Sequence, residues 1–138
     1  MSALQRMILE EPLSRVVLKP LVSLKSQDSL RAAIDLMVER KVGCIAVVEN
    51  EKLIGIFTER DVLHKIPILE KIKLPQLTLS EFMTPEPETI SPHHQIAFAL
   101  TRMSVGGYRH LPIVEHDRLV GIVSIRDIFA YLLSRTDK

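Results

Sequence analysis

The sequence predicts an α/β (α+β) chain of two pseudo-symmetric β-α-β-β-α repeats that pack together through their small sheets. Three observations support this prediction: an internal repeat, alternating strand and helix periodicity within each copy, and the shortness of each copy. A unit of about 45 residues buries too little apolar surface to be stable by itself. The two copies are therefore expected to pack with pseudo-twofold symmetry.

The composition excludes several classes of protein. The 138 residues include 18 Lys and Arg against 17 Asp and Glu, a formal net charge of +1, so nucleic-acid binding is not the default expectation. No apolar stretch approaches the roughly 20 residues needed to cross a bilayer, so no membrane-spanning segment is expected. Binding to a membrane surface is not expected either, because residues 1–12 have no basic face. A single cysteine, Cys44, and a start without the apolar run of a signal peptide predict a cytoplasmic protein.

The two copies are related by one constant shift along the chain, which is the separation of Gly55 and Gly121. Residues 55–61 match residues 121–127, and the same repeat shift aligns the residues before them without a gap. We therefore divide the chain into an N-terminal segment, a first repeat, a linker and a second repeat, at residues 1–15, 16–65, 66–82 and 83–135.

Each copy is expected to contain a first strand and then an amphipathic helix, and the repeat shift aligns residues 23–24 with residues 89–90 ahead of that helix. Apolar residues of that helix recur at the spacing of one helical face. In the first copy they are Leu30, Ala33, Ile34, Met37 and Val38, and in the second they are Ile96, Ala99, Leu100 and Met103. Ser91 followed by Pro92 predicts the start of the second helix, with the serine as its N-cap.

A β-hairpin and a last helix complete each copy. The strand pairs are residues 44–48 with 53–57 and residues 110–114 with 119–123, and the turn residues are Asn50, Glu51, His116 and Asp117. The last helix begins at Thr58 or at Ser124. In the second copy its apolar stripe consists of Ile125, Ile128, Phe129, Leu132 and Leu133.

Two further segments are too apolar to be free tethers. The linker is expected to wrap one edge of the pair, with Pro67 and Pro75 breaking any long helix. Its apolar residues are Ile66, Ile68, Leu69, Ile72, Leu74, Leu77 and Leu79. Residues 1–12 predict a short amphipathic helix that needs a surface to lie on, either a dimer partner or the second copy.

A hydroxyl and a carboxylate recur at the start of each last helix, and a glycine recurs on the strand just before it. Gly55 and Gly121 would allow close approach of another chain segment or of a ligand. Thr58 and Asp61, like Ser124 and Asp127, are three positions apart, so both side chains can face one ligand. The carboxylate can accept from ribose hydroxyls, while the hydroxyl and the free N–H groups can contact a phosphate. The same pattern is typical of a capping box, which stabilises a helix by about 0.5–2 kcal/mol without any ligand. Taken alone, the pattern favours the cap, and the two roles are compatible.

Together these features resemble a tandem cystathionine-β-synthase (CBS) domain pair, or Bateman module. The resemblance covers residues 16–133 and rests on the β-α-β-β-α copies, residues 82–90, the strand at 109–114 and the repeated Gly-apolar-x-Thr/Ser-x-x-Asp motif. Proteins similar to this one bind AMP, ADP, ATP, S-adenosylmethionine or NAD(H) in clefts between the copies. They commonly form dimers and act as regulatory sensors. The resemblance thus implies a stand-alone homodimeric sensor for an adenine nucleotide, with Mg²⁺ as a companion of the ligand, and an unknown regulated protein as its partner.

The resemblance assigns ribose and phosphate contacts to the two motifs and adds residues from neighbouring strands. Arg109 and His110 correspond to the phosphate end of a cleft, where a guanidinium fits phosphate oxygens. The adenine ring is expected near residues 89–90 and Pro112. The ligand-binding candidates are Thr58, Asp61, Thr89, Ile90, Arg109, His110, Pro112, Ser124 and Asp127. Secondary candidates are Ser23, Leu24, Ala46, Arg60 and Arg126.

The two copies are not chemically equivalent. Residues 43–46 contain no Arg, His or Pro, whereas residues 109–112 contain all three, so the second set should bind phosphate better. The sequence does not assign which aspartate works with which strand. A solvated charge is the alternative for each arginine, and a half-buried imidazole is the alternative for His110.

No catalytic or metal site is predicted. Cys44 in its apolar strand is interpreted as a buried hydrophobe, and the adjacent His93 and His94 point about 100° apart on a helix, which does not suit a shared metal. No acid, base and nucleophile assemble, so the chain is not expected to be an enzyme and needs no obligatory cofactor. The main alternative function is a structural or protein-interaction module whose clefts stay empty. An S-adenosylmethionine or NAD(H) binder, a nucleotide-processing enzyme and a nucleic-acid-binding module are further alternatives.

Overall fold

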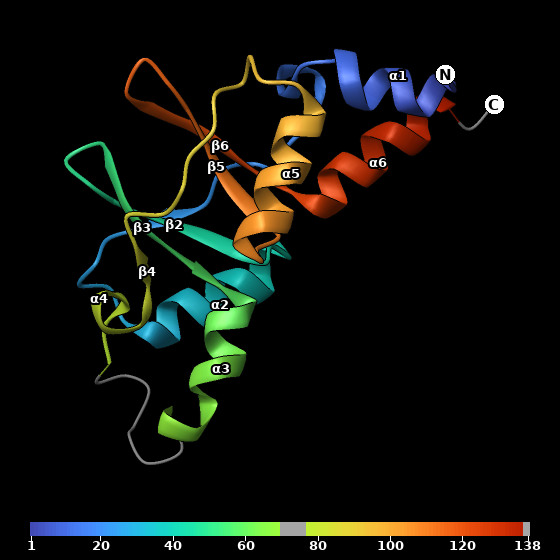
Figure 1. Ribbon diagram of the computed structural model, residues 1–138. Helices are drawn as coiled ribbons and strands as arrows, with labels where there is room; N and C mark the ends of the chain where they lie inside the picture. Colours follow the sequence, from blue (N-terminus) through green and yellow to red (C-terminus); the bar gives the residue numbers. More distant parts are fainter. Residues whose placement is uncertain (70–76, 137–138) are drawn as a thin grey trace. The chain divides into compact units, whose positions relative to one another are not determined.

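The computed structural model describes residues 1–69 and 77–136, and these form two compact units (Figure 1). The first-copy unit is Leu21–Pro87. The second-copy unit joins Met1–Pro20 to the chain from Glu88 onward. The segment that precedes the first repeat therefore belongs structurally to the second copy.

The first-copy unit is built on a four-stranded sheet of order β1-β2-β3-β4, in which β1 is parallel to β2 and the other pairs are antiparallel. Its strands are β1 (Ser23–Leu24), β2 (Cys44–Glu49), β3 (Lys52–Thr58) and β4 (Thr84–Pro85). Its helices are α2 (Leu30–Arg40), α3 (Glu59–Leu69) and α4 (Leu79–Phe82). Strand β2 lies between β1 and β3, and its first four residues are buried.

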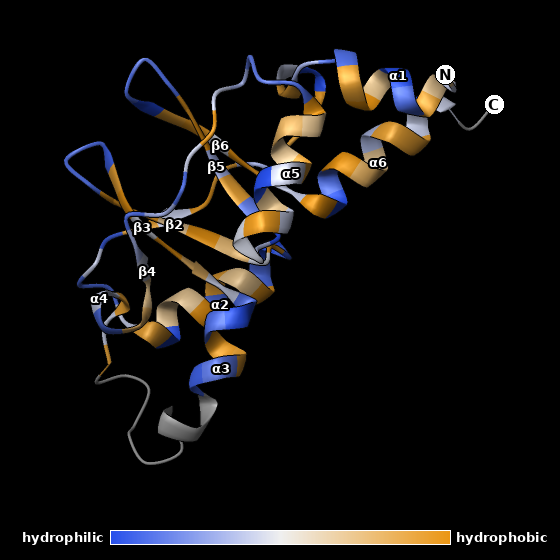
Figure 2. Ribbon diagram, in the orientation of Figure 1, coloured by the Kyte–Doolittle hydropathy of each residue, from blue (hydrophilic) through white to orange (hydrophobic). Residues whose placement is uncertain are grey.

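The second-copy unit is built on the antiparallel hairpin of β5 (His110–Glu115) and β6 (Arg118–Ser124). Ile90 adds a parallel bridge to Ile113 on the other side of β5. The helices are α1 (Ala3–Glu10), the 3-10 turn η1 (Leu13–Arg15), α5 (Ile96–Gly106) and α6 (Ile125–Thr136). Figure 2 shows apolar strands in both hairpins and hydrophilic turns at their tips.

The repeat shift of the sequence is reproduced in the register of the strands. Cys44 faces Thr58 as His110 faces Ser124, and both ladders have an irregularity at the same place, after Val47 and after Ile113. The turn residues Asn50, Glu51, His116 and Asp117 all have positive φ, as a type I′ hairpin turn requires. The predicted mixed α/β fold of two repeats is thereby confirmed.

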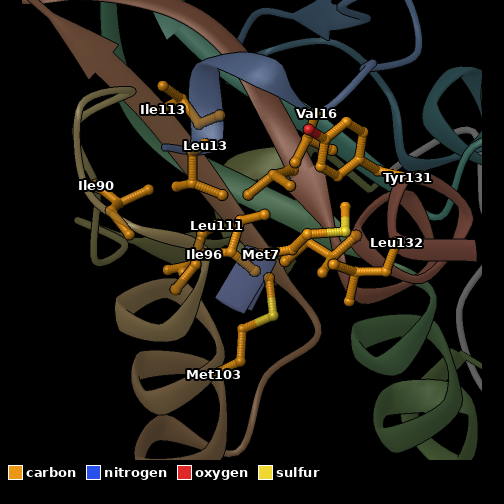
Figure 3. Packing of buried hydrophobic residues seen from close by; sticks show 13 residues of the cluster. Met7, Leu13, Val16, Ile90, Ile96, Met103, Leu111, Ile113, Tyr131 and Leu132 are labelled. Atoms are coloured by element: carbon orange, nitrogen blue, oxygen red, sulfur yellow. The ribbon is translucent and has the colours of Figure 1, made fainter. Parts of the chain in front are cut away.

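The segments before the two repeats are exchanged between the units. Leu13 and Val16 are buried in the core of the second-copy unit, among strand and helix residues (Figure 3). Leu79 and Phe82, at the equivalent positions, are buried in the core of the first-copy unit. Matching antiparallel bridges, Pro12 with Gln95 and Thr78 with Ser29, hold the segments in place.

Two glycines permit this close packing. A Cβ atom added at Gly55 would lie 2.6 Å from the Met83 Sδ atom and 3.0 Å from the carbonyl oxygen of Thr84. A Cβ added at Gly121 would lie 2.7 Å from Cδ1 of Leu18, the residue equivalent to Thr84. Of the two expected reasons for glycine, close approach of a chain segment is the one that the structure shows.

The N-terminal helix packs against α5 and α6, so the second copy is one surface that supports it. Met7 is buried in the core of this unit, where Figure 3 shows its side chain close to Leu132. Beyond the helix, the Tyr131 hydroxyl donates to Glu11 Oε1. The capping box of Ser2 and Gln5 fixes the start of the helix.

The predicted start of the second amphipathic helix was wrong. Helix α5 begins at Ile96, and Ser91 instead accepts a hydrogen bond from the His93 N–H in a preceding turn. Tertiary contacts decide this boundary, because Gln95 bridges Pro12 and the Ile96 N–H donates to the carbonyl of Glu11.

Most of the apolar stripes face the two cores, but Val38, Phe129 and Leu133 are exposed. Of the linker, Leu77 and Leu79 are buried, whereas residues 70–76 and the side chains of residues 66–69 lie outside the description. Within the described part of the chain, no helix has the length and hydrophobicity needed to cross a membrane.

Candidate functional site

The first motif lies where β3 passes into α3. The Thr58 N–H donates to Asp61 Oδ2 at 2.9 Å, and the Asp61 N–H donates to Thr58 Oγ1 at 3.3 Å. The Thr58 hydroxyl lies 3.2 Å from the same carboxylate oxygen. These reciprocal bonds form a capping box, so the motif performs the structural role expected of it.

The second motif has the same geometry where β6 passes into α6. The Ser124 N–H donates to Asp127 Oδ2 at 2.9 Å, and the Asp127 N–H donates to Ser124 Oγ at 3.0 Å. Both aspartates are only partly exposed. Each helix start therefore presents a carboxylate and a hydroxyl side by side, held in a fixed orientation by the backbone.

Asp61 has two further partners, which sequence reasoning missed. The Lys65 ammonium lies 3.4 Å from Asp61 Oδ1, and the Thr84 hydroxyl lies 3.4 Å from the same oxygen. The spacing of Asp61 and Lys65, four positions apart on one helix, was a signal that could have identified the ion pair. Thr84 had no such signal because it reaches Asp61 through the pairing of β4 with β3.

Cys44 borders the first motif, since it faces Thr58 across the β2–β3 ladder. Burial, assisted by the nearby negative charge of Asp61, raises the pKa of its thiol from the usual 9.0 to about 12. The side chain is thus a neutral, buried hydrophobe, as the sequence predicted.

An open hollow of about 650 Å³ lies in the second-copy unit, along α5, the turn after it and the first residues of α6. Ser104, Tyr108, Arg109 and Arg126 supply its polar groups, and Leu100, Met103, Ile125 and Phe129 supply its apolar surface. The Ile125 N–H donates to the carbonyl of Arg109 at 3.0 Å, which joins the two arginine-bearing segments. Two guanidinium groups beside an apolar wall suit an anionic ligand that carries a ring.

Arg109 and Arg126, which line this hollow, are two of the ligand-binding candidates named from the sequence. Tyr108 and Ser104 were missed, because neither lies in a motif and Tyr108 is placed by the left-handed turn at Gly107. His110 is half-buried and faces Ser124 across the β5–β6 ladder.

The three candidates for adenine binding, Thr89, Ile90 and Pro112, differ in how exposed they are. The Ile90 side chain is buried, its N–H donates to the carbonyl of Pro112 at 3.0 Å, and its carbonyl accepts from Val114 at 2.9 Å. Pro112 is also fully buried. Ile90 and Pro112 therefore serve the sheet and the core, while Thr89 is the exposed member of the group.

The secondary candidates of the first copy are mostly structural. Ser23 and Leu24 form β1, and the N–H of the buried Ala46 donates to the carbonyl of Val22 at 3.0 Å. Arg60 is exposed, with its Nε 3.3 Å from His64 Nε2. Among the described residues, no cluster of three or more His, Cys, Asp or Glu side chains could hold a metal ion.

The CBS domain family model matches residues 13–68 and 79–134. The chain belongs to the CBS domain family. The two matches are related by the same repeat shift, so each CBS domain begins at the leucine whose segment is exchanged, Leu13 or Leu79.

The chain is also similar to individual proteins and to solved structures. An uncharacterized 33.4 kDa protein of Thermofilum pendens is 36% identical over 113 residues, which cover 81% of this chain and 36% of that protein's length. A CBS domain protein from Pyrobaculum aerophilum, solved with AMP, has a TM-score of 0.77 at 22% identity and covers 92% of this chain and 99% of its own. A CBS domain pair solved with 5-methylthioadenosine and S-adenosyl-L-methionine has a TM-score of 0.78 at 22% identity, with 91% and 98% covered. At these identities the two solved structures show the fold.

Proposed function

We propose that this CBS pair binds an adenosine-containing nucleotide, AMP, ADP or ATP foremost, and acts as a regulatory ligand sensor. The observation that carries the proposal is the hollow that Arg109 and Arg126 line in the second-copy unit. Ser124 and Asp127 do not line the hollow but are chain neighbours of its lining residues Ile125 and Arg126. The guanidinium groups of Arg109 and Arg126 would bind phosphate, and the Asp127 carboxylate would accept hydrogen bonds from the ribose hydroxyls. The ligands of the two similar structures, which share an adenosine group, support the same class.

The proposed mechanism breaks no bond. A ligand shifts a protein between two arrangements only by the difference of its affinities for them, so binding itself is the signal that a cytoplasmic partner protein would read. No obligatory cofactor is needed, and Mg²⁺ would enter only as part of a di- or triphosphate ligand.

We also propose that the chain forms a homodimer. Phe129 and Leu133 of α6 are 53% and 63% exposed, and Val105 of α5 is 70% exposed. Exposed large apolar side chains four positions apart on one helix, as Phe129 and Leu133 are on α6, are typical of surfaces that another molecule covers.

A calorimetric titration tests the ligand proposal. The protein is stripped of bound small molecules by mild denaturation and refolding, then titrated with AMP, ADP, ATP, S-adenosylmethionine and NADH, with and without magnesium. Saturable binding of an adenine nucleotide is expected. Flat titrations across the panel would favour the second candidate function, a structural or interaction module, for which the reciprocal capping bonds of both motifs are the supporting observation.

A further inference from the structure

The aspartates of the two motifs differ in what already surrounds them. Asp61 accepts from Lys65 and Thr84 in addition to Thr58, and its side chain is 13% exposed. Among the described residues, the hydrogen bonds of Asp127 outside the helix backbone are those with Ser124. The two motifs therefore share a sequence pattern and a cap but not an electrostatic environment.

The difference originates in two substitutions between the repeats. Tyr131 is the second-copy equivalent of Lys65, and its hydroxyl donates to Glu11 of the N-terminal segment instead of approaching Asp127. Leu18 is the equivalent of Thr84 and has no polar side-chain atom. The second copy thus replaces both of the extra partners of the first motif.

Lys65 is anchored at more than one point. Its ammonium also donates to the carbonyl of Phe82 and lies 6.0 Å from the centre of the Phe82 ring. The ammonium therefore links Asp61 of α3 to the segment that precedes β4. A ligand that took the Asp61 carboxylate would have to compete with a partly buried ion pair, whose side chains are 30% and 13% exposed.

We propose that the Lys65 ammonium takes the place at Asp61 that a ligand would otherwise occupy. Asp61 then has a structural role, and nucleotide binding depends on Asp127. The inference rests on the proposed function. Lys65 would then determine which of the two motifs binds the ligand, because its side chain fills the place of a ligand in the first motif. Arg109 supports the same assignment, since Gly43 occupies its equivalent position in the first copy.

The binding part of the proposal is tested with Asp61→Asn and Asp127→Asn, titrated with the nucleotide that binds the wild type. Asparagine keeps an oxygen for the cap and removes the charge, so both variants should fold, which circular dichroism checks. We expect one ligand per chain, an affinity loss of at least about tenfold in Asp127→Asn, and a change within about twofold in Asp61→Asn. Two ligands per chain, or the larger loss in Asp61→Asn, would overturn the proposal.

The ion-pair part is tested without any ligand, by a double-mutant cycle on the thermal unfolding midpoint. Asp61→Asn and Lys65→Met are each expected to lower the midpoint by about 3 °C, and the double variant by little more than either single variant. Asp127→Asn and Tyr131→Phe form the matched control pair, for which the effects should add. Additive effects of Asp61→Asn and Lys65→Met would overturn the role of Lys65. If no nucleotide binds the wild type, the proposed function fails, while this cycle still decides whether Lys65 holds Asp61.

Discussion

Leu13 and Leu79 occupy equivalent positions of the two CBS domains, and each is buried in the unit built on the other copy. Leu13 is 1% exposed among residues of the second copy, and Leu79 is 0% exposed among residues of the first. The chain therefore exchanges the segment at the start of each CBS domain. Neither hydrophobic core is completed by one contiguous repeat.

This exchange makes both leucines essential for stability. Truncation of a fully buried leucine to alanine removes its packing and leaves a cavity, so Leu13→Ala and Leu79→Ala should each lower the free energy of unfolding by about 2–5 kcal/mol. Val17, which is 81% exposed, is the matched control, and Val17→Ala should change it by less than about 0.5 kcal/mol. Urea denaturation measures all three. Equal effects of Leu13→Ala and Val17→Ala would contradict the exchange.

The two packing glycines should respond differently to alanine. At Gly121 the added methyl meets the flexible end of Leu18, whereas at Gly55 it also meets the backbone oxygen of Thr84. We therefore expect Gly55→Ala to destabilise the protein by about 1–3 kcal/mol and Gly121→Ala by clearly less. Thermal unfolding of the two variants compares them directly, and the reverse order would show that β4 does not pack on β3 as described.

The two arginines of the hollow should discriminate between ligands by their phosphate. Replacing Arg109 or Arg126 with alanine removes charge-assisted hydrogen bonds, so AMP affinity should fall by about tenfold or more. Adenosine affinity should stay within about twofold, because adenosine has no phosphate. Calorimetry with both ligands separates the cases. An equal loss for AMP and adenosine would mean that the arginines act on the fold and not on the phosphate.

The buried thiol of Cys44 predicts a specific pH dependence. Its pKa rises from 9.0 to about 12 on folding, so the unfolded chain loses this proton first as the pH increases. The stabilising contribution is complete below about pH 9 and is lost between about pH 9 and pH 12. Unfolding free energies across this range should fall more steeply in the wild type than in Cys44→Ala. Parallel curves for the two proteins would contradict the burial of the thiol.

The exposed face of α6 predicts the oligomeric state. Leu133→Glu places a charge on a surface proposed to be covered, so sedimentation velocity should show monomers where the wild type sediments as a dimer. Val17→Glu, on an apolar but separate exposed position, serves as the control and should leave the dimer intact. Sedimentation of the wild-type protein as a monomer would contradict the proposed dimer.

The features that the sequence predicted correctly depend on local patterns. The hairpins, their turns and the apolar stripes recur at a fixed shift, and each is determined by residues within a few positions of one another. The start of α5 was predicted wrongly because Pro12 and Glu11, which lie before the first repeat and far away in sequence, decide it. Thr84 and Tyr108 could not be predicted from the sequence for the same reason. Only the fold brings Thr84 to Asp61 and Tyr108 to the hollow. Lys65 was within reach of a local rule, because it follows Asp61 by one helical turn.

An amide ¹⁵N–¹H NMR titration of the protein with AMP tests directly whether the nucleotide binds at the second motif and not at the first. We expect saturable shifts of the Ser124, Asp127 and Arg109 amides, together with unperturbed Thr58 and Asp61 amides. Saturable shifts confined to Thr58 and Asp61, or no shifts at millimolar AMP, would contradict this expectation.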